Sequence, residues 1–348
     1  MTRLLVLVAT LLAFALPAAA APKAGKIRVL YLDQSVGWVH APVAPPKASN
    51  GPTLSEVAMA EIGARSGAFT VRSTRDASTI TPETLKEIDV LVFYTTGALP
   101  IAPATWTTIQ DWIKSGKGGF VGLHSATDTG WPYDGRGETY TAFINGKFAG
   151  HPWTQGTPIT IQALGGASEP MNQAWPRRFA YAEEIYQYAD YDPTKVRALQ
   201  VLDFSDMALK RPWLVPVTWT RQVGKGRLLY TNLGHTPSTW DDPRYRRQIV
   251  DAVRWTAGRL PGAAQPNPQE QALWALRSLL AYDDARPKAE IERRIARLAK
   301  ADPAWLGDAA ARVAALRPLW PAKPDSDRAP FETAYSALLT EVLAKSAN

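Results

Sequence analysis

The stretch that decides the fold is residues 118–129, which read GGFVGLHSATDT. Its first half is a short apolar run with β-branched and aromatic residues, typical of a buried strand, and a polar turn follows at once. In α/β enzymes, a turn after a central strand is a common place for a nucleophile or a ligand. The residue at that place here is His124, neither Cys nor Ser. The sequence therefore raises the question of what an imidazole does there.

Strands alternate with helices through the first half of the chain. Residues 53–67 begin with Thr, have Glu three positions later and end with Gly, which predicts a capped helix. A second helix is predicted where the sequence opens with Pro and closes with Gly, at 103–118. The predicted strands are 26–33 (KIRVLYLD), 69–76 (FTVRSTRD), 89–96 (DVLVFYTT) and 118–126. This alternation predicts an α/β fold with a mostly parallel sheet and helices on both faces.

The second half has four further strand patterns with little helix between them. They are 158–164 (PITIQAL), 196–204 (VRALQVLDF), 215–222 (VPVTWTRQ) and 226–234 (GRLLYTNLG), and residues 221–227 form a hairpin turn between the last two. An amphipathic helix at 243–258 closes this domain, which we place at 26–259. A Pro- and Gly-rich linker is predicted at 260–269, followed by a C-terminal extension of about four short helices at 270–348.

The N-terminus predicts export. Residues 1–20 (MTRLLVLVATLLAFALPAAA) have a positive start, an apolar stretch and a small-residue cleavage site, as a secretory signal peptide has. The 348-residue chain has no Cys, so it has neither disulfides nor thiol chemistry. We therefore expect a periplasmic or secreted protein without a transmembrane anchor. The modest net charge of +7 is scattered, and with an export signal it does not indicate a nucleic-acid partner.

The chain has four histidines, His40, His124, His151 and His235, and each lies in a predicted loop or at a strand end. Ligands of parallel sheets bind beyond the carboxyl ends of the strands, so we expect a shared histidine-lined pocket at that edge. Imidazole titrates near neutral pH and also binds zinc. Acid/base catalysis and metal binding therefore stay open. The spacing matches no local zinc motif, and a divalent metal such as zinc is a hypothesis.

Several carboxylates lie near these histidines in the sequence. Asp33 ends the first strand, and with His40, His124 and His235 it makes a candidate metal-ligand set. Asp128 follows His124 and is a candidate catalytic residue, or else it caps the turn. Glu183 and Glu184 are adjacent further along the chain. A Walker motif, a GxGxxG after a strand and a GxSxG are all missing from the sequence.

The motifs GGFVGLHSATDT, FAGHPW, EEIY and PVTWTRQVGKGRLLYTNLGH, in this order, resemble those of the ThuA-like family of trehalose-utilisation proteins. The resemblance covers residues 26–259. It implies a flavodoxin-like fold related to class I glutamine amidotransferases, in which a catalytic Cys follows the central strand. Because His124 has that place here, the resemblance does not imply glutaminase chemistry. It implies a role in disaccharide or 3-keto-sugar utilisation.

Residues are carried over by position. The motif residues are His124, Ser125, Asp128, His151, Pro152, Trp153, Glu184, Tyr186, Gly234 and His235. Position 183 departs from the family pattern, because the family often has Asp before the motif glutamate, which is Glu184 here, and this chain has Glu183. The catalytic candidates are His124, His235, Glu184 and Asp128. The candidates for substrate binding are Trp131, Trp153, His151, Tyr186 and Ser125, with the two tryptophans as a sugar platform.

Two functions fit the sequence. The first is an exported enzyme that acts on a disaccharide or 3-keto-sugar by histidine-mediated acid/base or metal-assisted chemistry. The alternative is a non-catalytic carbohydrate-binding or scaffold protein on an amidotransferase-like fold. The expected partners are a sugar or keto-sugar ligand and other sugar-utilisation proteins. Sugar binding without turnover and without metal would favour the alternative.

Overall fold

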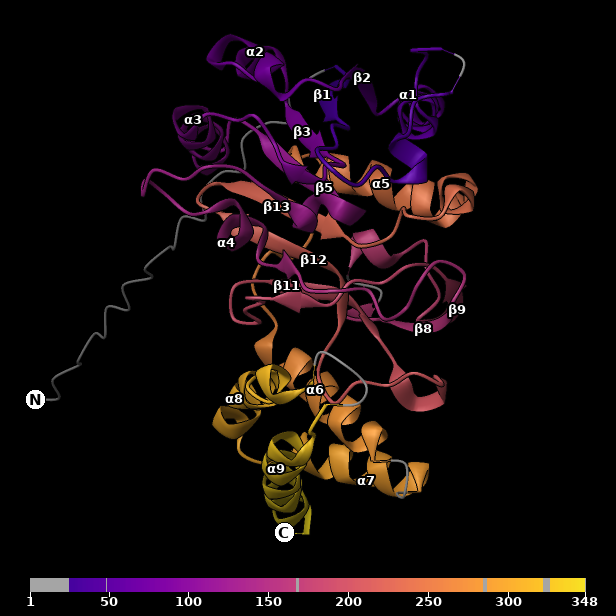
Figure 1. Cartoon of the computed structure of the whole chain (residues 1–348), viewed down its shortest axis with the longest axis vertical. Helices are drawn as coiled ribbons and strands as arrows, with labels where there is room; N and C mark the ends of the chain where they lie inside the picture. The colour runs from indigo at the N-terminus through magenta and orange to yellow at the C-terminus, as the bar shows by residue number, and fades with distance from the viewer. Residues whose placement is uncertain (1–24, 48, 167–168, 284–286, 322–325, 348) are drawn as a thin grey trace, which may run out of the picture.

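The structure is a computed structural model, and it describes residues 25–347 apart from 48, 167–168, 284–286 and 322–325. The predicted signal peptide, 1–20, lies outside the described residues. A nine-stranded sheet forms the centre of the molecule, in the order β2-β1-β3-β5-β13-β12-β11-β8-β9 (Figure 1).

The sheet has a parallel half and an antiparallel half. The parallel strands are β2 (Phe69–Thr74), β1 (Ile27–Leu32), β3 (Val90–Phe93), β5 (Gly119–Leu123) and β13 (Gly226–Thr231). The antiparallel strands are β12 (Pro216–Val223), β11 (Arg197–Leu202), β8 (Pro158–Ala163) and β9 (Arg178–Ala182). The predicted α/β fold is therefore confirmed, although β9 was not anticipated from the sequence.

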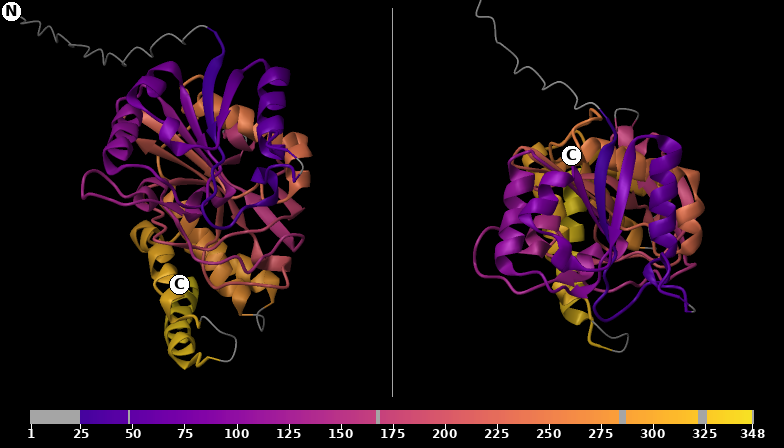
Figure 2. Two further views of the ribbon diagram at one scale, coloured as in Figure 1. Left: turned by 45° about the horizontal axis from the view of Figure 1, so that its top comes forward. Right: turned by 90° about the horizontal axis from the view of Figure 1, so that it is seen from above.

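Helices cover both faces of the sheet (Figure 2). Val29 and Tyr31 of β1 belong to one hydrophobic core, whereas Leu30 and Leu32 belong to the other, as the two-residue period of a strand requires. The first core contains α1 (Leu54–Ser66) and α5 (Pro243–Thr256), and the second contains α2 (Pro82–Glu87), α3 (Pro103–Lys114) and α4 (Tyr140–Ile144). Because both faces are buried, β3 and β5 are apolar throughout.

Two small sheets fasten loops beyond the carboxyl ends of the central strands. β4 (Gly97–Ala98) pairs with β6 (Thr129–Gly130), which joins the segments that follow β3 and β5. β7 (Lys147–Phe148) pairs with β10 (Tyr188–Ala189). They are too short to give a sequence pattern of their own, and they hold the loops that carry the candidate site residues.

The C-terminal helices lie beyond the antiparallel end of the sheet (Figure 1). They are α6 (Pro268–Tyr282), α7 (Lys288–Leu298), α8 (Pro303–Ala314) and α9 (Ala329–Ala347), and α6 begins two residues inside the predicted linker. Their apolar residues continue the core that contains α1 and α5. Gln271 fixes α6 to the main domain by donating to the carbonyls of Pro193 and Val196, at 3.0 and 2.9 Å. Among the described residues, no helix is long and apolar enough to cross a membrane.

The N-terminus of α1 is tied to the end of β1. Thr53 and Glu56 form the predicted capping box, in which the Thr53 hydroxyl accepts from the Glu56 amide. The same hydroxyl donates to the Asp33 carboxylate over 2.9 Å. Burial and the nearby Glu56 raise the pKa of Asp33 to about 7. Asp33 therefore helps to position a helix end, but at a cost whenever it is ionised.

We predict that Asp33→Asn stabilises the protein above pH 7. The folded chain keeps the Asp33 proton up to about pH 7, whereas the unfolded chain releases it near the usual value of 3.8. The unfolding free energy of the wild type therefore decreases as pH rises between these values. Asn retains an acceptor for Thr53 without the charge. At pH 8 the variant should be more stable by on the order of a few kcal/mol, and the gain should shrink toward pH 4.

Urea unfolding at pH 4.5 and pH 8 measures this difference. Asp111→Asn, at an exposed position on α3, controls for the loss of one carboxylate. If Asp33→Asn and the wild type lose the same unfolding free energy between the two pH values, the prediction is wrong.

Candidate functional site

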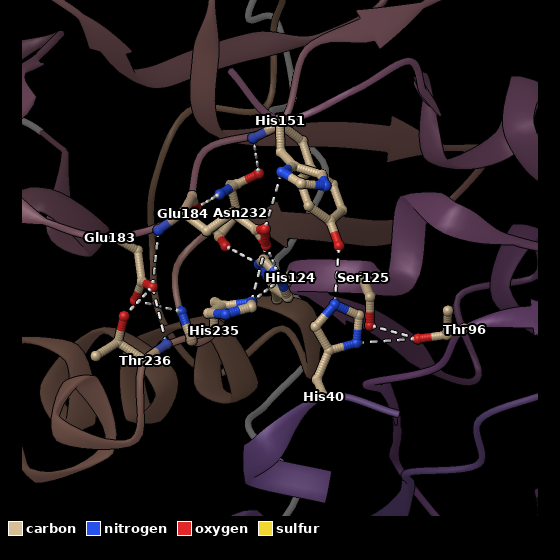
Figure 3. A network of polar contacts seen from close by, with 12 residues as sticks. His40, Thr96, His124, Ser125, His151, Glu183, Glu184, Asn232, His235 and Thr236 are labelled. Carbon is tan, nitrogen blue, oxygen red and sulfur yellow. Dashed lines mark hydrogen bonds and ion pairs between the residues drawn. The ribbon is translucent and has the colours of Figure 1, made fainter. Parts of the chain in front are cut away.

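Three of the four histidines meet at the carboxyl edge of the parallel strands (Figure 3). His40 lies after β1 and caps the 3-10 turn η1 (Ala41–Val43), His124 opens the turn η3 (His124–Asp128) after β5, and His235 follows β13. Their ring centroids are 4.9 Å (His40–His124), 5.3 Å (His40–His235) and 5.0 Å (His124–His235) apart. The sheet topology explains this meeting, because β1, β5 and β13 are parallel strands of one sheet, with β5 beside β13 and only β3 between β1 and β5.

Glu184 completes the cluster. One of its carboxylate oxygens, Oε2, lies 2.9 Å from His235 Nδ1 and 3.8 Å from His124 Nε2. The other, Oε1, lies 3.3 Å from His151 Nδ1. His40, His124, Glu184 and His235 each offer one ligand atom, and these atoms all lie within 4.8 Å of one another. We name these four residues the His–Glu cluster.

The donor set fits a divalent transition metal. Ligands held tetrahedrally at ~2.1 Å from zinc lie about 3.4 Å from each other. His124 Nε2 and His235 Nδ1 are 3.1 Å apart, and both face Glu184. Three imidazoles with one carboxylate are also a donor combination that zinc and related metals accept. Geometry and chemistry therefore agree.

The tautomer of His124 is set by a backbone carbonyl. Its Nδ1–H donates to the Asn232 carbonyl over 2.7 Å, which leaves the Nε2 lone pair directed to His235 and Glu184. Such a bond behind a ligating imidazole orients it and makes it more basic. Burial lowers the pKa of His124 well below its usual value and lowers that of His40 to about 4. Both rings are therefore neutral at pH 7, the form that binds metals.

His40 is held from both sides. Its Nε2 lies 3.1 Å from the Tyr186 hydroxyl, and its Nδ1 lies 3.4 Å from Thr96 Oγ1. Thr96 in turn donates to Ser125 Oγ over 3.0 Å. Burial raises the pKa of Tyr186, so its phenol keeps its proton. Tyr186 and Ser125, two predicted substrate contacts, are both buried in this structure and support the histidines.

The adjacent residues Glu183 and Glu184 contact different parts of the site. Successive side chains of an extended chain point in opposite directions, and Glu183 turns away from the cluster. It is fully buried and accepts from Thr236 N at 2.8 Å, Thr236 Oγ1 at 2.6 Å, Thr239 Oγ1 at 2.6 Å and Gly234 N at 3.2 Å. Glu183 thereby fixes the loop that carries His235, while Glu184 faces the imidazoles (Figure 3).

The backbone around the site is constrained at two points. His124 adopts a φ of 42°, in the left-handed region that residues other than Gly, Asn and Asp rarely enter. Gly97 has a φ of 77°, and a Cβ there would lie 1.8 Å from the carbonyl oxygen of Val36. Only Gly at that position lets the loop before His40 approach β4 so closely. Non-glycine residues in such conformations are concentrated at functional sites.

The structure corrects two predicted site residues. Asp33 does not join the His–Glu cluster, because its carboxylate is engaged with Thr53 at the N-terminus of α1. Trp153 does not offer a sugar platform, because the ring is fully buried, stacks on Phe204 and donates its indole N–H to the Leu209 carbonyl. A stacking platform needs an exposed ring face.

The other predicted residues lie at the periphery. Asp128 is half-buried and outside the cluster, and burial raises the pKa of its carboxyl. Trp131 is half-buried, with its ring centroid 4.9 Å from that of Trp106 and 4.6 Å from that of Tyr140. His151 contacts Glu184, and its side chain remains 46% exposed, which makes it the solvent-facing histidine of the site.

Sequence reasoning missed three supporting residues, namely Thr96, Glu183 as the loop anchor, and Asn232. Asn232 directly follows β13, and Thr96 lies three residues beyond the end of β3. The available signal was their position, since polar residues just after buried parallel strands gather at the same edge. Their partners lie up to 56 residues away for Thr96 and Glu183 and 108 residues away for Asn232, and could not be assigned from the chain alone.

A family model described as trehalose utilisation matches residues 28–256 of the chain. The chain belongs to the ThuA family. This match spans the sheet and the whole His–Glu cluster, and it stops before the C-terminal helices. The family assignment made from the motifs is therefore confirmed.

Two solved structures share the fold of this ThuA protein. One is a putative ThuA-like protein from Bacteroides uniformis, with 22% sequence identity and a TM-score of 0.51, covering 70% of this chain and 95% of that one. The other, from Parabacteroides merdae, has 13% identity and a TM-score of 0.51, covering 68% and 92%. No curated protein matches the chain.

We predict that Glu183→Gln destabilises the protein, although the change removes only a charge. Gln keeps one carbonyl oxygen, and its amide nitrogen would face N–H and O–H donors that have no other acceptor among the described residues. One or more buried donors then stay unsatisfied, which should lower the unfolding free energy by about 1–3 kcal/mol.

Denaturant unfolding of Glu183→Gln and of the adjacent Glu184→Gln tests this assignment. Glu184 faces imidazoles, which can exchange donor and acceptor roles by changing tautomer, so its variant should lose less stability. Equal losses in both variants would contradict the division of tasks between the two glutamates.

Proposed function

We propose that this ThuA protein is an exported, metal-dependent enzyme that acts on a disaccharide or 3-keto-sugar. The observation that carries the proposal is the His–Glu cluster, which combines the buried imidazoles of His40 and His124 with His235 and a carboxylate at the ligand-binding edge of the sheet. Membership of a family described by trehalose utilisation supports the substrate class. The predicted signal peptide at residues 1–20 supports export.

The cluster residues would hold the metal. His124 Nε2, His235 Nδ1 and Glu184 Oε2 already face one another, and His40 would be the fourth ligand after one of its contacts with Tyr186 or Thr96 gives way. A divalent metal held there would supply Lewis acidity for a carbonyl or hydroxyl oxygen of a sugar.

Burial divides the histidines between two roles. The His124 side chain has no exposed surface, so it cannot exchange a proton with a bound sugar, and its role is that of a ligand. His151 is the opposite case, because its ring is nearly half exposed while Nδ1 contacts Glu184. We assign His151 the proton transfer to and from the sugar, with Glu184 orienting its ring.

An exposed loop next to the cluster replaces Trp153 as the sugar platform. Trp38 precedes His40 by two residues and is 71% exposed, and its neighbours Val36 and Val39 are 41% and 47% exposed. This loop packs closely against β4, because Gly97 of β4 has no side chain to collide with the Val36 carbonyl. Trp38 is thus close in the chain to His40, a candidate metal ligand. Its flat, exposed indole is suited to stacking on an apolar sugar face. Trp131 is the other tryptophan that keeps partial exposure near the turn after β5.

We predict that the purified protein binds one divalent metal per chain and that the cluster sets its affinity. After chelation and reloading with Zn²⁺, elemental analysis of the wild type should give about one ion per chain. His124→Ala and His235→Ala each remove a ligand and should weaken binding by more than the ~10–100-fold that loss of an outer partner causes.

His151→Ala is the matched control, because it removes a histidine that contacts Glu184 but lies outside the cluster, and it should weaken metal binding less than either ligand variant. Metal content that is unchanged in His124→Ala and His235→Ala would rule out the cluster as the binding site.

We predict that Trp38→Ala weakens sugar binding while metal content stays at the wild-type level. Stacking is lost but the ligand set is intact, so the Michaelis constant for a 3-keto-disaccharide should rise about 5- to 10-fold, which corresponds to about 1 kcal/mol of stacking energy. Turnover of 3-ketotrehalose and of trehalose, followed by chromatography, provides the assay.

The same assay separates enzyme from binding protein. His151→Ala should reduce turnover about 100-fold, as loss of a general acid or base does. Sugar binding by the wild type without turnover, with and without added metal, would instead show a non-catalytic carbohydrate-binding protein.

A further inference from the structure

A cavity lies between the main domain and the C-terminal helices, and none of the His–Glu cluster residues lines it. Its volume is about 400 Å³. The segment around β10 and residues 213–214 form one wall, and α8 with the turn η8 (Arg317–Leu319) forms the other. Ala310 and Ala314, one helical turn apart on α8, leave room between the walls because their side chains are small.

The walls of this cavity are mainly aromatic and aliphatic. Tyr188, Tyr191 and Trp213 line the side of the main domain, and Pro318 lines the side of the helices. A volume of this size with apolar walls and few polar groups is typical of a small-molecule site. Such walls bind the apolar body of a ligand and leave its orientation to the polar groups.

The polar groups here are unsatisfied donors. Arg317 Nη2 and Trp213 Nε1 are both shielded from solvent, and within the described part of the chain neither has a hydrogen-bond partner. The Arg317 guanidinium carbon lies 6.0 Å from the centre of the Trp213 ring, so the two donors belong to neighbouring side chains. Buried donors without an acceptor are unfavourable, and a guanidinium is especially suited to a bidentate oxyanion.

The positive charge of Arg317 is only partly balanced by negative groups nearby. Burial lowers the pKa of Arg317 to about 10, and the effects of Tyr188 and Asp190 that raise it are smaller. Asp190, which also lines the cavity, is an exposed carboxylate and makes no hydrogen bond or ion pair to Arg317 among those of the described residues. The cavity therefore retains a positive centre inside apolar walls.

We propose that this cavity binds a small monocarboxylate with an aromatic or aliphatic body, whose carboxylate pairs with Arg317 and accepts from Trp213. Both nitrogens are shielded in this structure, so binding requires that the guanidinium and the indole both turn toward the ligand. The apolar body lies between Tyr188, Tyr191 and the alanine face of α8. The cavity shares no lining residue with the His–Glu cluster.

Calorimetric titration of the full chain with 4-phenylbutyrate and with its neutral amide, 4-phenylbutyramide, tests the proposal. The two probes have the same apolar body and differ in the anionic group. The carboxylate should bind saturably at one site, and the amide should bind about 10- to 100-fold more weakly, as loss of hydrogen bonds to a charged group implies. Equal affinities, or no saturable binding of the carboxylate up to its solubility limit, would overturn the proposal.

Three variants locate the site. Arg317→Met should weaken binding of the carboxylate to the level of the amide, with an unchanged thermal midpoint as the control for folding. Ala314→Trp fills the cavity from an exposed position and should abolish binding of both probes. Asp190→Asn removes the competing carboxylate and should tighten binding of 4-phenylbutyrate. Wild-type affinity in Ala314→Trp would place the ligand elsewhere, and should Arg317→Met fail to fold, this variant and the amide still decide.

Discussion

Asn232 connects His124 with the segment that carries Glu184, through its backbone carbonyl and its side chain. Its backbone carbonyl accepts from His124 Nδ1, and its side-chain nitrogen Nδ2 donates to the Glu184 carbonyl over 2.7 Å. Its side-chain oxygen accepts from Tyr186 N at 3.0 Å and from the Tyr188 hydroxyl at 2.8 Å. The end of β13 thus sets the tautomer of the imidazole after β5 and the path of residues 184–188. Replacing the Asn232 side chain would leave the Glu184 carbonyl and the Tyr186 amide without these hydrogen bonds, whereas the backbone bond to His124 would stay.

Burial decides which chemistry each histidine can perform. An imidazole with no access to solvent, such as His124, stays neutral and can serve only groups already next to it. The turn after β5 holds His124 away from solvent, and the most exposed histidine of the site, His151, lies in a different loop.

The sequence was sufficient for the parallel half of the sheet and for the meeting of His40, His124 and His235, because hydrophobic periodicity and strand direction determine both. It failed where side-chain direction or distant partners decide. Asp33 ends β1 as a ligand would, yet it faces the N-terminus of α1. Trp153 has the polar neighbours of a surface residue but lies in the core, since its indole N–H finds a carbonyl 56 residues away. No local pattern distinguishes these outcomes.

Tyr188 belongs to two places at once. Its ring lines the cavity beneath the C-terminal helices, while its hydroxyl holds Asn232 and thereby His124. Under the two proposals, a ligand that shifts this ring would also change the affinity of the His–Glu cluster for a metal, and thermodynamic reciprocity would require metal binding to change the affinity for that ligand by the same factor. The helical extension, which the ThuA match does not include, would then be coupled to the cluster through the side chain of Tyr188.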